Sequence, residues 1–212
     1  MMKLYSVKEI FLTLQGEGAQ VGRVAVFCRF SGCNLWSGRE KDRLFAQCRF
    51  CDTDFVGTKG TMGGRYSAEQ LADLIASAWI PEEKEERYCV LTGGEPLLQV
   101  DSTLIKALNK RNFTISVETN GTIKPPEGID WICVSPKAGC DLKVKNGQEL
   151  KLVFPQVDAP PENYIDFDFD IFSLQPMDGS FLKENTNLAI SYCFKNPKWR
   201  VSLQTHKFIG IR

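Results

Sequence analysis

The chain has 212 residues, of which 43% are hydrophobic and 25% are charged, values typical of soluble globular proteins. They exclude a fibrous or wholly disordered protein and suit one domain, residues 1–212, with a single core. Because the 26 Lys and Arg residues balance the 26 Asp and Glu residues, no net field attracts a nucleic acid or an anionic membrane, and we expect a small-molecule substrate.

The N-terminus and the cysteine content predict a cytoplasmic protein. The first residues lack the apolar core of a signal peptide, and no segment approaches the roughly 20 apolar residues of a membrane span. Because cytosolic thiols are kept reduced, eight cysteines argue against a disulfide framework and favour metal ligation by some of them.

The strand-like segments of the chain are short, and most are apolar on both faces. Such segments are typical of a parallel sheet that is covered on both sides. About six strands are predicted, and the last of the seven segments is an additional candidate. In chain order the segments are residues 24–30, 87–91, 114–117, 131–134, 150–154, 171–174 and 201–204.

Three segments have the periodicity and end signals of helices. Residues 67–79 begin with Ser67 and Gln70, which match a capping box. Residues 101–111 form the second predicted helix, and residues 184–195 form the third, which an Asn-Pro pair ends.

Strands that alternate with helices predict right-handed βαβ units in a parallel barrel or an open doubly wound sheet. Residues 119–130 and the connection after Ser135 are rich in glycine and proline, so neither connection readily forms a helix. Residues 31–66 form the one long segment without a clear periodic element, and a loop of this length in a compact domain is usually functional or disordered.

Three cysteines lie in this loop, directly after the first predicted strand: Cys33, Cys48 and Cys51. Active sites of parallel α/β sheets gather at this end of the strands. Three thiolates can bind three irons of a cubane and leave the fourth iron open, whereas a structural zinc ion needs a fourth ligand. From spacing alone, zinc or unrelated thiols remain alternatives. The cysteines within apolar segments are expected to be small core residues, and they are Cys28, Cys89, Cys133 and Cys193; Cys140 has no assigned role.

Four successive predicted strands end in polar or glycine-rich segments. The first is Thr92-Gly93-Gly94-Glu95-Pro96, where glycines allow the backbone to approach a ligand, although an ordinary glycine turn is the alternative. The other three segments are Glu118-Thr119-Asn120-Gly121, Ser135-Pro136-Lys137 and Gln175-Pro176-Met177-Asp178. Their common position favours one ligand site at the mouth of the barrel.

These residues resemble the radical S-adenosylmethionine superfamily, and within it the family of 7-carboxy-7-deazaguanine synthases. The superfamily usually separates its first two cysteines by three residues, whereas some synthases share the enlargement that lies here between Cys33 and Cys48. The resemblance runs from Val7 to about Phe208. Besides the four strand ends, the segments that carry it are Leu14-Gln15-Gly16-Glu17-Gly18, Cys33-Asn34-Leu35-Trp36, Cys51-Asp52-Thr53-Asp54 and Gln204-Thr205-His206-Lys207.

The resemblance implies an α/β fold, a partial parallel, TIM-like β-barrel of about six strands with few helices. It implies that Cys33, Cys48 and Cys51 hold a [4Fe-4S] cluster that binds S-adenosylmethionine and takes electrons from flavodoxin or a similar donor. For Glu118, a structural carboxylate that accepts backbone N–H groups is an equal alternative to a cofactor contact. The implied cofactor contacts are Gly94, Glu118, Ser135, Pro136, Lys137, Gln175, Pro176, Met177 and Asp178.

The implied reaction is the ring contraction of 6-carboxy-5,6,7,8-tetrahydropterin to 7-carboxy-7-deazaguanine, with loss of ammonia, on the route to queuosine. A turn threonine is the alternative to the implied Mg²⁺ ligand Thr53, and an ordinary core or surface histidine is the alternative to a substrate contact at His206. The family also implies a homodimer and a C-terminal end that folds over the substrate, with the role of Arg212 left open. The implied substrate contacts are Leu14, Gln15, Gly16, Arg29, Thr92 and His206.

Arg29 lies on the same face of its predicted strand as Phe27 and Ser31. A guanidinium inside a barrel needs an anion, and the substrate carboxylate provides one through a bidentate pair. The alternative is an internal salt bridge with a carboxylate such as Glu118.

Two other functions compete with the synthase. A radical-generating activase of glycyl radical enzymes has a similar size and cluster motif, but the segments around Gln15 and Gln204 argue against it. A zinc-binding interaction domain would use Cys33, Cys48, Cys51 and His206. Absorbance near about 400 nm after anaerobic reconstitution distinguishes an iron–sulfur cluster from zinc.

Overall fold

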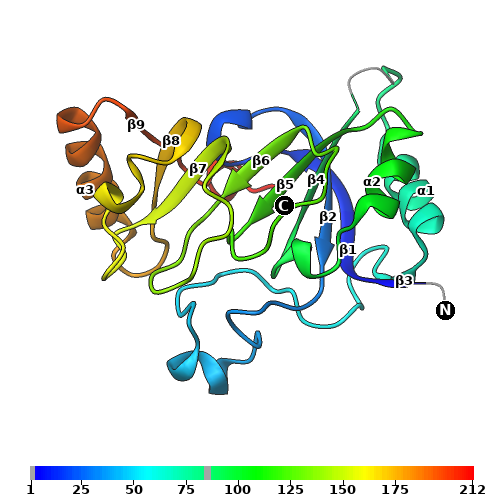
Figure 1. The fold of residues 1–212 in the computed structure, drawn as a ribbon, viewed down its shortest axis with the longest axis horizontal. Coiled ribbons are helices and arrows are strands. Elements are labelled where there is room, and N and C mark those ends of the chain that lie inside the picture. The colour runs from blue at the N-terminus through cyan, green and yellow to red at the C-terminus, as the bar shows by residue number, and fades with distance from the viewer. Residues whose placement is uncertain (1–2, 84–86) are drawn as a thin grey trace.

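The structure is a computed structural model that describes residues 3–83 and 87–212. Residues 1 and 2, which belong to the N-terminal stretch without a signal-peptide core, and residues 84–86 lie outside the described residues. The described residues form one nine-stranded sheet in the order β3-β1-β2-β4-β5-β6-β7-β8-β9 (Figure 1). In the same part of the chain, no helix has the length and apolarity to cross a membrane.

From β2 to β9 every neighbouring pair of strands is parallel, whereas β1 runs antiparallel to both β2 and β3. The sheet begins at β3 and ends at β9 without closing, so the predicted α/β fold with a partial barrel is confirmed. The strands are β1 (Tyr5–Leu14), β2 (Val24–Phe30), β3 (Gly64–Tyr66), β4 (Tyr88–Gly93), β5 (Thr114–Thr119), β6 (Trp131–Val134), β7 (Asn146–Phe154), β8 (Asp168–Pro176) and β9 (Trp199–Val201).

The predicted helices are all present. Ser67 caps α1 and forms the predicted capping box with Gln70, and the Asp101 carboxylate caps α2 by accepting from two backbone N–H groups. A short fourth helix near the C-terminus was not predicted. The α-helices are α1 (Ala68–Ala78), α2 (Ser102–Asn109), α3 (Leu182–Lys195) and α4 (Thr205–Ile209), and the 3₁₀ helices are η1 (Gly18–Gln20), η2 (Glu40–Phe45), η3 (Pro96–Leu98) and η4 (Pro161–Tyr164).

Three predictions of elements need correction. The estimate of about six strands is too low because β1 and β3 were missed, and β1 carries a register shift between Val7 and Glu9 that interrupts its alternation. The candidate strand at residues 201–204 is present but displaced, because β9 spans Trp199–Val201 and shares only Val201 with it. The long loop 31–66 is mostly irregular, but η2 lies within it and β3 forms its last three residues.

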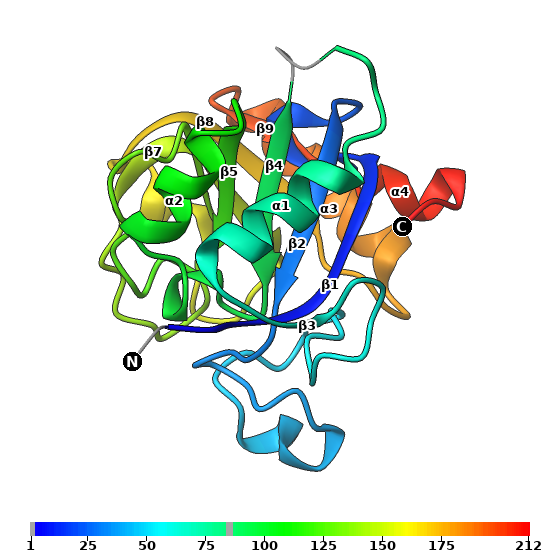
Figure 2. The same ribbon diagram turned by 90° about the vertical axis from the view of Figure 1, so that its right-hand side faces the viewer.

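The sheet has two chemically different faces. On the outer face, Ile115 and Val117 of β5 pack with α1 and α2, while Leu150 and Leu152 of β7 pack in a second core that includes Ala189 of α3 (Figure 2). Successive residues of a strand point to opposite faces, so the neighbours of these residues point inward.

A small apolar cluster of Ala25, Phe27, Tyr88 and Val90 fills part of the inner face. Polar residues follow this cluster toward the C-terminal ends of the same strands, as Arg29 follows Phe27 and Thr92 follows Val90. The parallel register therefore gathers the strand-end residues at one edge.

Candidate active site

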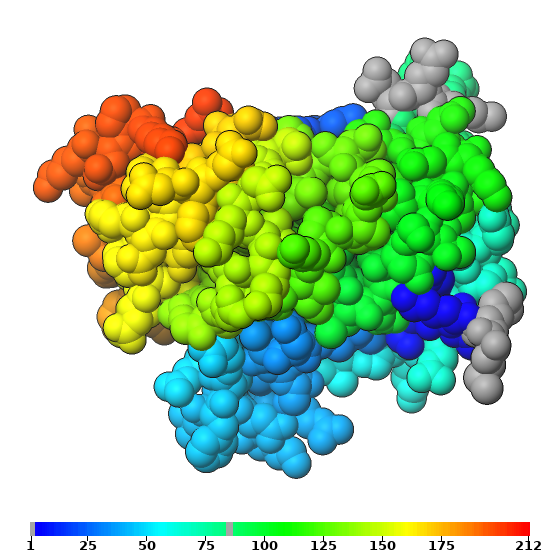
Figure 3. All heavy atoms as spheres, viewed as in Figure 1, coloured from blue at the N-terminus to red at the C-terminus, as the bar shows by residue number. Residues whose placement is uncertain are grey.

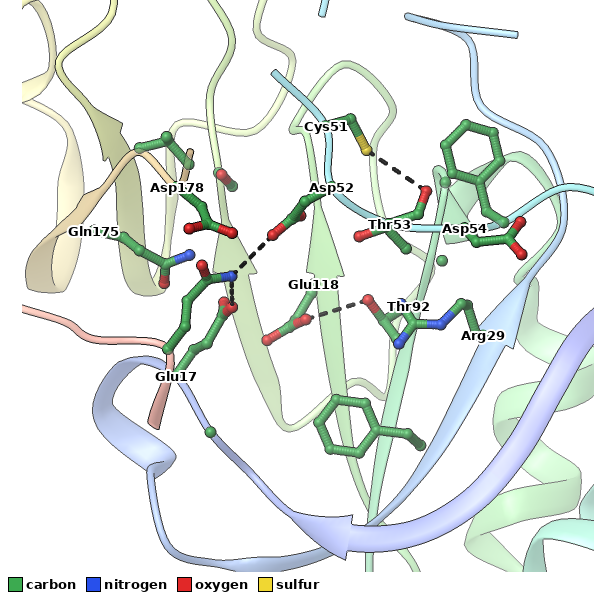
Figure 4. Close-up of a pocket in the computed structure, with 18 of the residues that line it drawn as sticks. Glu17, Arg29, Cys51, Asp52, Thr53, Asp54, Thr92, Glu118, Gln175 and Asp178 are labelled. Atoms are coloured by element: carbon green, nitrogen blue, oxygen red, sulfur yellow. Dashed lines mark hydrogen bonds between the residues drawn. The ribbon is translucent and has the colours of Figure 1, made fainter. Parts of the chain in front are cut away.

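A cavity of about 620 Å³ opens at this edge, a volume within the usual range for small-molecule sites. Strand ends, β1, the cysteine loop and the C-terminal residues all contribute to its lining, and the close-up shows Arg29, Thr92, Glu118 and Gln175 around it (Figure 4). Every predicted site residue except Pro136 lines this cavity.

The three cysteines of the loop line the same cavity. Cys48 is buried and the other two are half-buried, and burial raises the pKa of the Cys33 and Cys48 thiols. Among residues 3–83 and 87–212, no group of three or more His, Cys, Asp or Glu side chains is arranged to hold a single metal ion. A cubane binds each thiolate at a different iron, so three thiols around one cavity suit such a cluster.

The other cysteines divide by position. Cys28 and Cys89 lie in the core of the outer face, as predicted. Cys133 is buried as predicted but also lines the cavity. Cys193 is only half-buried, so its prediction as a core residue holds in part. Cys140 is half-buried, and its backbone N–H donates to the Lys137 carbonyl at 3.2 Å.

Aromatic contacts organise the cysteine loop, which projects from the body of the protein (Figure 3). The Trp36 and Phe55 rings pack edge to face with their centroids 5.6 Å apart. The Arg43 guanidinium lies 4.0 Å from the Trp36 ring centroid and donates to the Cys51 carbonyl at 3.0 Å. These contacts hold the segment around Cys51 against the cavity.

The glycines at the end of β4 are required by close backbone approach. A Cβ on Gly94 would lie 2.1 Å from the Gly32 carbonyl oxygen, and Gly93 has a φ of +136°. The fully buried Glu95 carboxylate accepts from Thr119 Oγ1 and the Asn120 N–H, both at 2.8 Å. These bonds join the ends of β4 and β5, and Glu95 does not line the cavity, while burial raises the pKa of its carboxyl group.

The segment after β6 contributes two of its three predicted residues. Lys137 lines the cavity, and its Nζ donates to the Ser135 carbonyl at 2.6 Å and to the Ser135 hydroxyl at 2.8 Å. Burial lowers the pKa of Lys137. Pro136 does not line the cavity, and its carbonyl accepts from the Gln156 amide at 3.3 Å, so its predicted contact with S-adenosylmethionine stays a prediction.

Arg29 points into the cavity, where its Nε lies 2.9 Å from Glu9 Oε1. The alternative of an internal salt bridge is therefore present, but its carboxylate is Glu9 and not Glu118, because the pairing of β1 with β2 places Glu9 opposite Arg29. The other Glu9 oxygen lies 2.9 Å from the Nη2 of Arg212, and both guanidinium groups lie over the Phe11 ring. Arg212 is thus held at the wall of the cavity.

Glu118 accepts hydrogen bonds from side chains, not from the backbone N–H groups that the structural alternative anticipated. Thr92 Oγ1 lies 3.2 Å from Glu118 (Figure 4). Gln15 Nε2 also lies at 3.2 Å, and Lys151 Nζ lies at 3.3 Å. Neither Lys151 nor Glu9 was predicted from the sequence. For Lys151 the available signal was a charged residue between two apolar residues of a covered strand.

The C-terminal segment closes one side of the cavity. The Thr205 N–H donates to the Gly16 carbonyl at 2.8 Å, and a Cβ on Gly16 would meet His206 Nδ1 at 2.2 Å. Lys207 Nζ bridges Asp52 and Asp178, with 2.6 Å to each carboxylate. His206 therefore lies beside the Leu14 to Gly16 segment. This proximity is consistent with the prediction that all of these residues contact the substrate.

A model of the radical SAM superfamily matches residues 45–142. A 7-carboxy-7-deazaguanine synthase of Bradyrhizobium diazoefficiens is 65% identical over 98% of this chain and 99% of its own, and one of Bordetella pertussis is 60% identical over 98% and 99%. The chain belongs to the family of 7-carboxy-7-deazaguanine synthases. A crystal structure of QueE from Escherichia coli superposes with a TM-score of 0.69 at 27% identity, covering 96% of this chain and 95% of that one.

Membership in the 7-carboxy-7-deazaguanine synthase family makes this chain a lyase of the radical SAM superfamily. The superfamily implies a [4Fe-4S] cluster and S-adenosylmethionine, and the three thiols of the cavity suit that cluster. The relatives support neither the activase nor the zinc-binding interaction domain.

Proposed function

We propose that the cavity binds 6-carboxy-5,6,7,8-tetrahydropterin and contracts its ring to 7-carboxy-7-deazaguanine, with release of ammonia, in the biosynthesis of queuosine. The substrate loses the elements of ammonia, so the reaction needs no external oxidant. The observation that carries the proposal is a single cavity lined by Cys33, Cys48 and Cys51 together with an arginine and hydrogen-bonding side chains for a polar heterocycle.

Cys33, Cys48 and Cys51 would hold the [4Fe-4S] cluster. When bound, the cluster and S-adenosylmethionine supply the radical that removes a hydrogen atom from C6 of the pterin. The cavity-lining residues Gly94, Ser135, Lys137, Gln175, Pro176, Met177 and Asp178 would surround S-adenosylmethionine. Asp178 is paired with Lys207, which supports a role in shaping that site.

Arg29 would bind the substrate carboxylate. Its pair with Glu9 uses the Nε–H, and a guanidinium has four further N–H donors for a bidentate pair. Thr53 would bind Mg²⁺ beside the same carboxylate. This role is supported by the position of Thr53 in the cavity wall between two aspartates, because hard cations prefer oxygen ligands.

Gln15 and Thr92, with the Leu14 and Gly16 segment and His206, would contact the pterin ring. A planar heterocycle with donors and acceptors on its edge needs such paired polar groups. Glu118 accepts from both Gln15 and Thr92, which supports a role on the substrate side of the cavity, and its contact with S-adenosylmethionine stays a prediction.

The remaining predictions concern the whole protein. Flavodoxin or a similar reductant would provide the electron, and two copies of the chain would form a homodimer. A single domain over residues 1–212, a cytoplasmic location, and the absence of nucleic-acid and membrane partners stay predictions.

Anaerobic turnover tests the proposed reaction. Reconstituted and chemically reduced protein is mixed with the pterin, S-adenosylmethionine and Mg²⁺, and mass spectrometry follows 7-carboxy-7-deazaguanine. Product is expected, with less in a matched reaction containing a Mg²⁺ chelator. Formation of 5′-deoxyadenosine without product would support the radical chemistry and reject the proposed substrate. Equal rates of product formation with and without the chelator would reject the proposed role of Mg²⁺.

A further inference from the structure

One buried lysine connects the residues proposed to contact the pterin. Lys151 lies in β7 between Leu150 and Leu152, which are fully buried on the outer face. Its own side chain points to the inner face, lines the cavity and is 6% exposed. The ammonium group lies 2.6 Å from Glu17 Oε2 and 3.3 Å from Glu118 Oε1, so it is held between two carboxylates.

These two carboxylates hold side chains from three separate parts of the chain. Glu118 Oε1 accepts from Gln15 Nε2, and Glu118 Oε2 accepts from Thr92 Oγ1, both at 3.2 Å. Glu17 Oε1 accepts from the Gln204 amide at 2.8 Å. The ammonium therefore lies at the centre of a network that joins the segment after β1, β4 and the C-terminal segment.

The charge at the centre of this network is stable. Burial works to lower the pKa of Lys151, but the carboxylates Glu118 and Glu17 outweigh burial and hold that pKa above its ordinary value. A buried ion pair is costly to break on one side, because the remaining charges lose their partner and move or take up solvent. Loss of the ammonium would therefore displace Glu118 and the side chains that donate to it.

We propose that Lys151 is a positioning residue for the ring contraction, because it fixes the Glu118 carboxylate that orients Gln15 and Thr92 toward the pterin. The inference rests on the proposed function, in which Gln15 and Thr92 contact the substrate. Lys151 acts through Glu118, and its contribution is to the substrate side of the cavity.

Steady-state kinetics of Lys151→Met tests this role. The KM for the pterin is expected to rise about tenfold, the change that corresponds to roughly 1.4 kcal/mol, which is the size of one or two hydrogen bonds. The KM for S-adenosylmethionine and the iron content are expected to stay unchanged. Lys183→Met, at an exposed position of α3, removes the same charge outside the cavity and should keep the wild-type KM.

A double-mutant cycle with Thr92→Val distinguishes positioning from a general loss of structure. Because Lys151 and Thr92 act through the same carboxylate, their effects on kcat/KM are expected to be less than additive. Additive effects, or a Lys151→Met variant with an unchanged pterin KM, would overturn the inference.

Lys151→Met leaves two carboxylates without their cation and risks misfolding, so a second variant combines it with Glu17→Gln. This pair removes one charge of each sign, and Glu118 still lacks its ammonium, so the raised KM is expected again. A wild-type KM in the double variant would contradict the role. If the wild-type protein makes no 7-carboxy-7-deazaguanine, the proposed function fails and this inference with it. If the wild-type protein makes the product and the variants have unaltered kinetics, the inference about Lys151 is overturned and the proposed function stands.

Discussion

The two faces of the sheet use the same strands for opposite purposes. On β7, Leu150 and Leu152 join a buried apolar core, while Lys151 between them carries a charge into the cavity. On β5, Val117 packs under the helices, and the next residue, Glu118, accepts a hydrogen bond from Thr92 in the cavity. The alternation of side chains along a strand makes this separation possible.

The outer face of the sheet contributes mainly to stability, and the inner face carries the groups of the proposed site. The outer face buries apolar surface, which is the dominant favourable contribution to folding. The inner face buries charges that need partners, and such groups contribute little net stability while they define a site. Substitutions on the two faces should therefore change mainly different measured quantities, and the predictions for Leu152 and Arg29 test that separation.

The largest effect is expected in the cysteine loop. Cys48→Ala removes a proposed cluster ligand from the cavity, so product formation should fall by at least about 10³-fold and the absorbance near about 400 nm should decrease. Iron analysis and mass spectrometry of the product measure both changes. Cys193→Ala, a half-buried thiol of α3 outside the cavity lining, is the control and should retain iron and turnover. Full activity of Cys48→Ala would contradict a three-cysteine cluster.

The outer face should respond in stability. Leu152→Ala removes a fully buried side chain from the second core and is expected to lower the free energy of unfolding by about 2–5 kcal/mol. Urea unfolding measures this change. Below the unfolding transition, kcat/KM should stay within about twofold of wild type, a margin set by typical effects away from the substrate. A tenfold loss of kcat/KM in fully folded Leu152→Ala would show that the faces are not separable.

The inner face should respond in binding. Arg29→Lys keeps the charge opposite Glu9 but removes the planar fork, so the KM for the pterin should rise about tenfold to a hundredfold. The unfolding free energy should change by less than about 1 kcal/mol, as expected for one hydrogen bond. Arg200→Lys, on an exposed position of β9, is the matched control. An unchanged pterin KM would remove Arg29 from the substrate site.

The smallest effect concerns pH. Burial works to raise the pKa of Glu17, but Lys151 outweighs it and lowers that pKa from 4.5 to about 2. Because the folded pKa lies below the unfolded value, the stability from this carboxylate is complete above about pH 4.5 and is lost as the pH falls toward about 2. The difference in unfolding free energy between wild type and Glu17→Gln should therefore shrink between pH 5 and pH 3, as urea titrations would measure. A difference that stays constant would contradict the ion pair.

Local signals explain what the sequence predicted well. Ser67 and Asp101 cap α1 and α2 by accepting from backbone N–H groups of their own helices, so the helix starts follow from nearby residues. The strand-end segments were assigned to one edge because parallel strands share a direction. That reasoning brought Thr92, Glu118 and Gln175 together correctly.

Contacts between distant segments explain what the sequence did not reveal. The pairing of Arg29 with Glu9 depends on an antiparallel strand whose alternation is interrupted by a register shift. Lys151 contacts the carboxylates of Glu17 and Glu118, which lie 134 and 33 residues away in the sequence. Local periodicity does not predict contacts at such separations. Pro136 was assigned with its neighbours although its side chain lies outside the cavity lining.

The most direct test is a crystal structure of the anaerobically reconstituted protein with S-adenosylmethionine and the pterin. We expect a cluster on Cys33, Cys48 and Cys51, with the pterin on the inner face and its carboxylate paired with Arg29. Thr92 should stay bonded to Glu118 beside the ring. A pterin bound outside this cavity, or a cluster held by other residues, would contradict the assignment of the inner face as the active site.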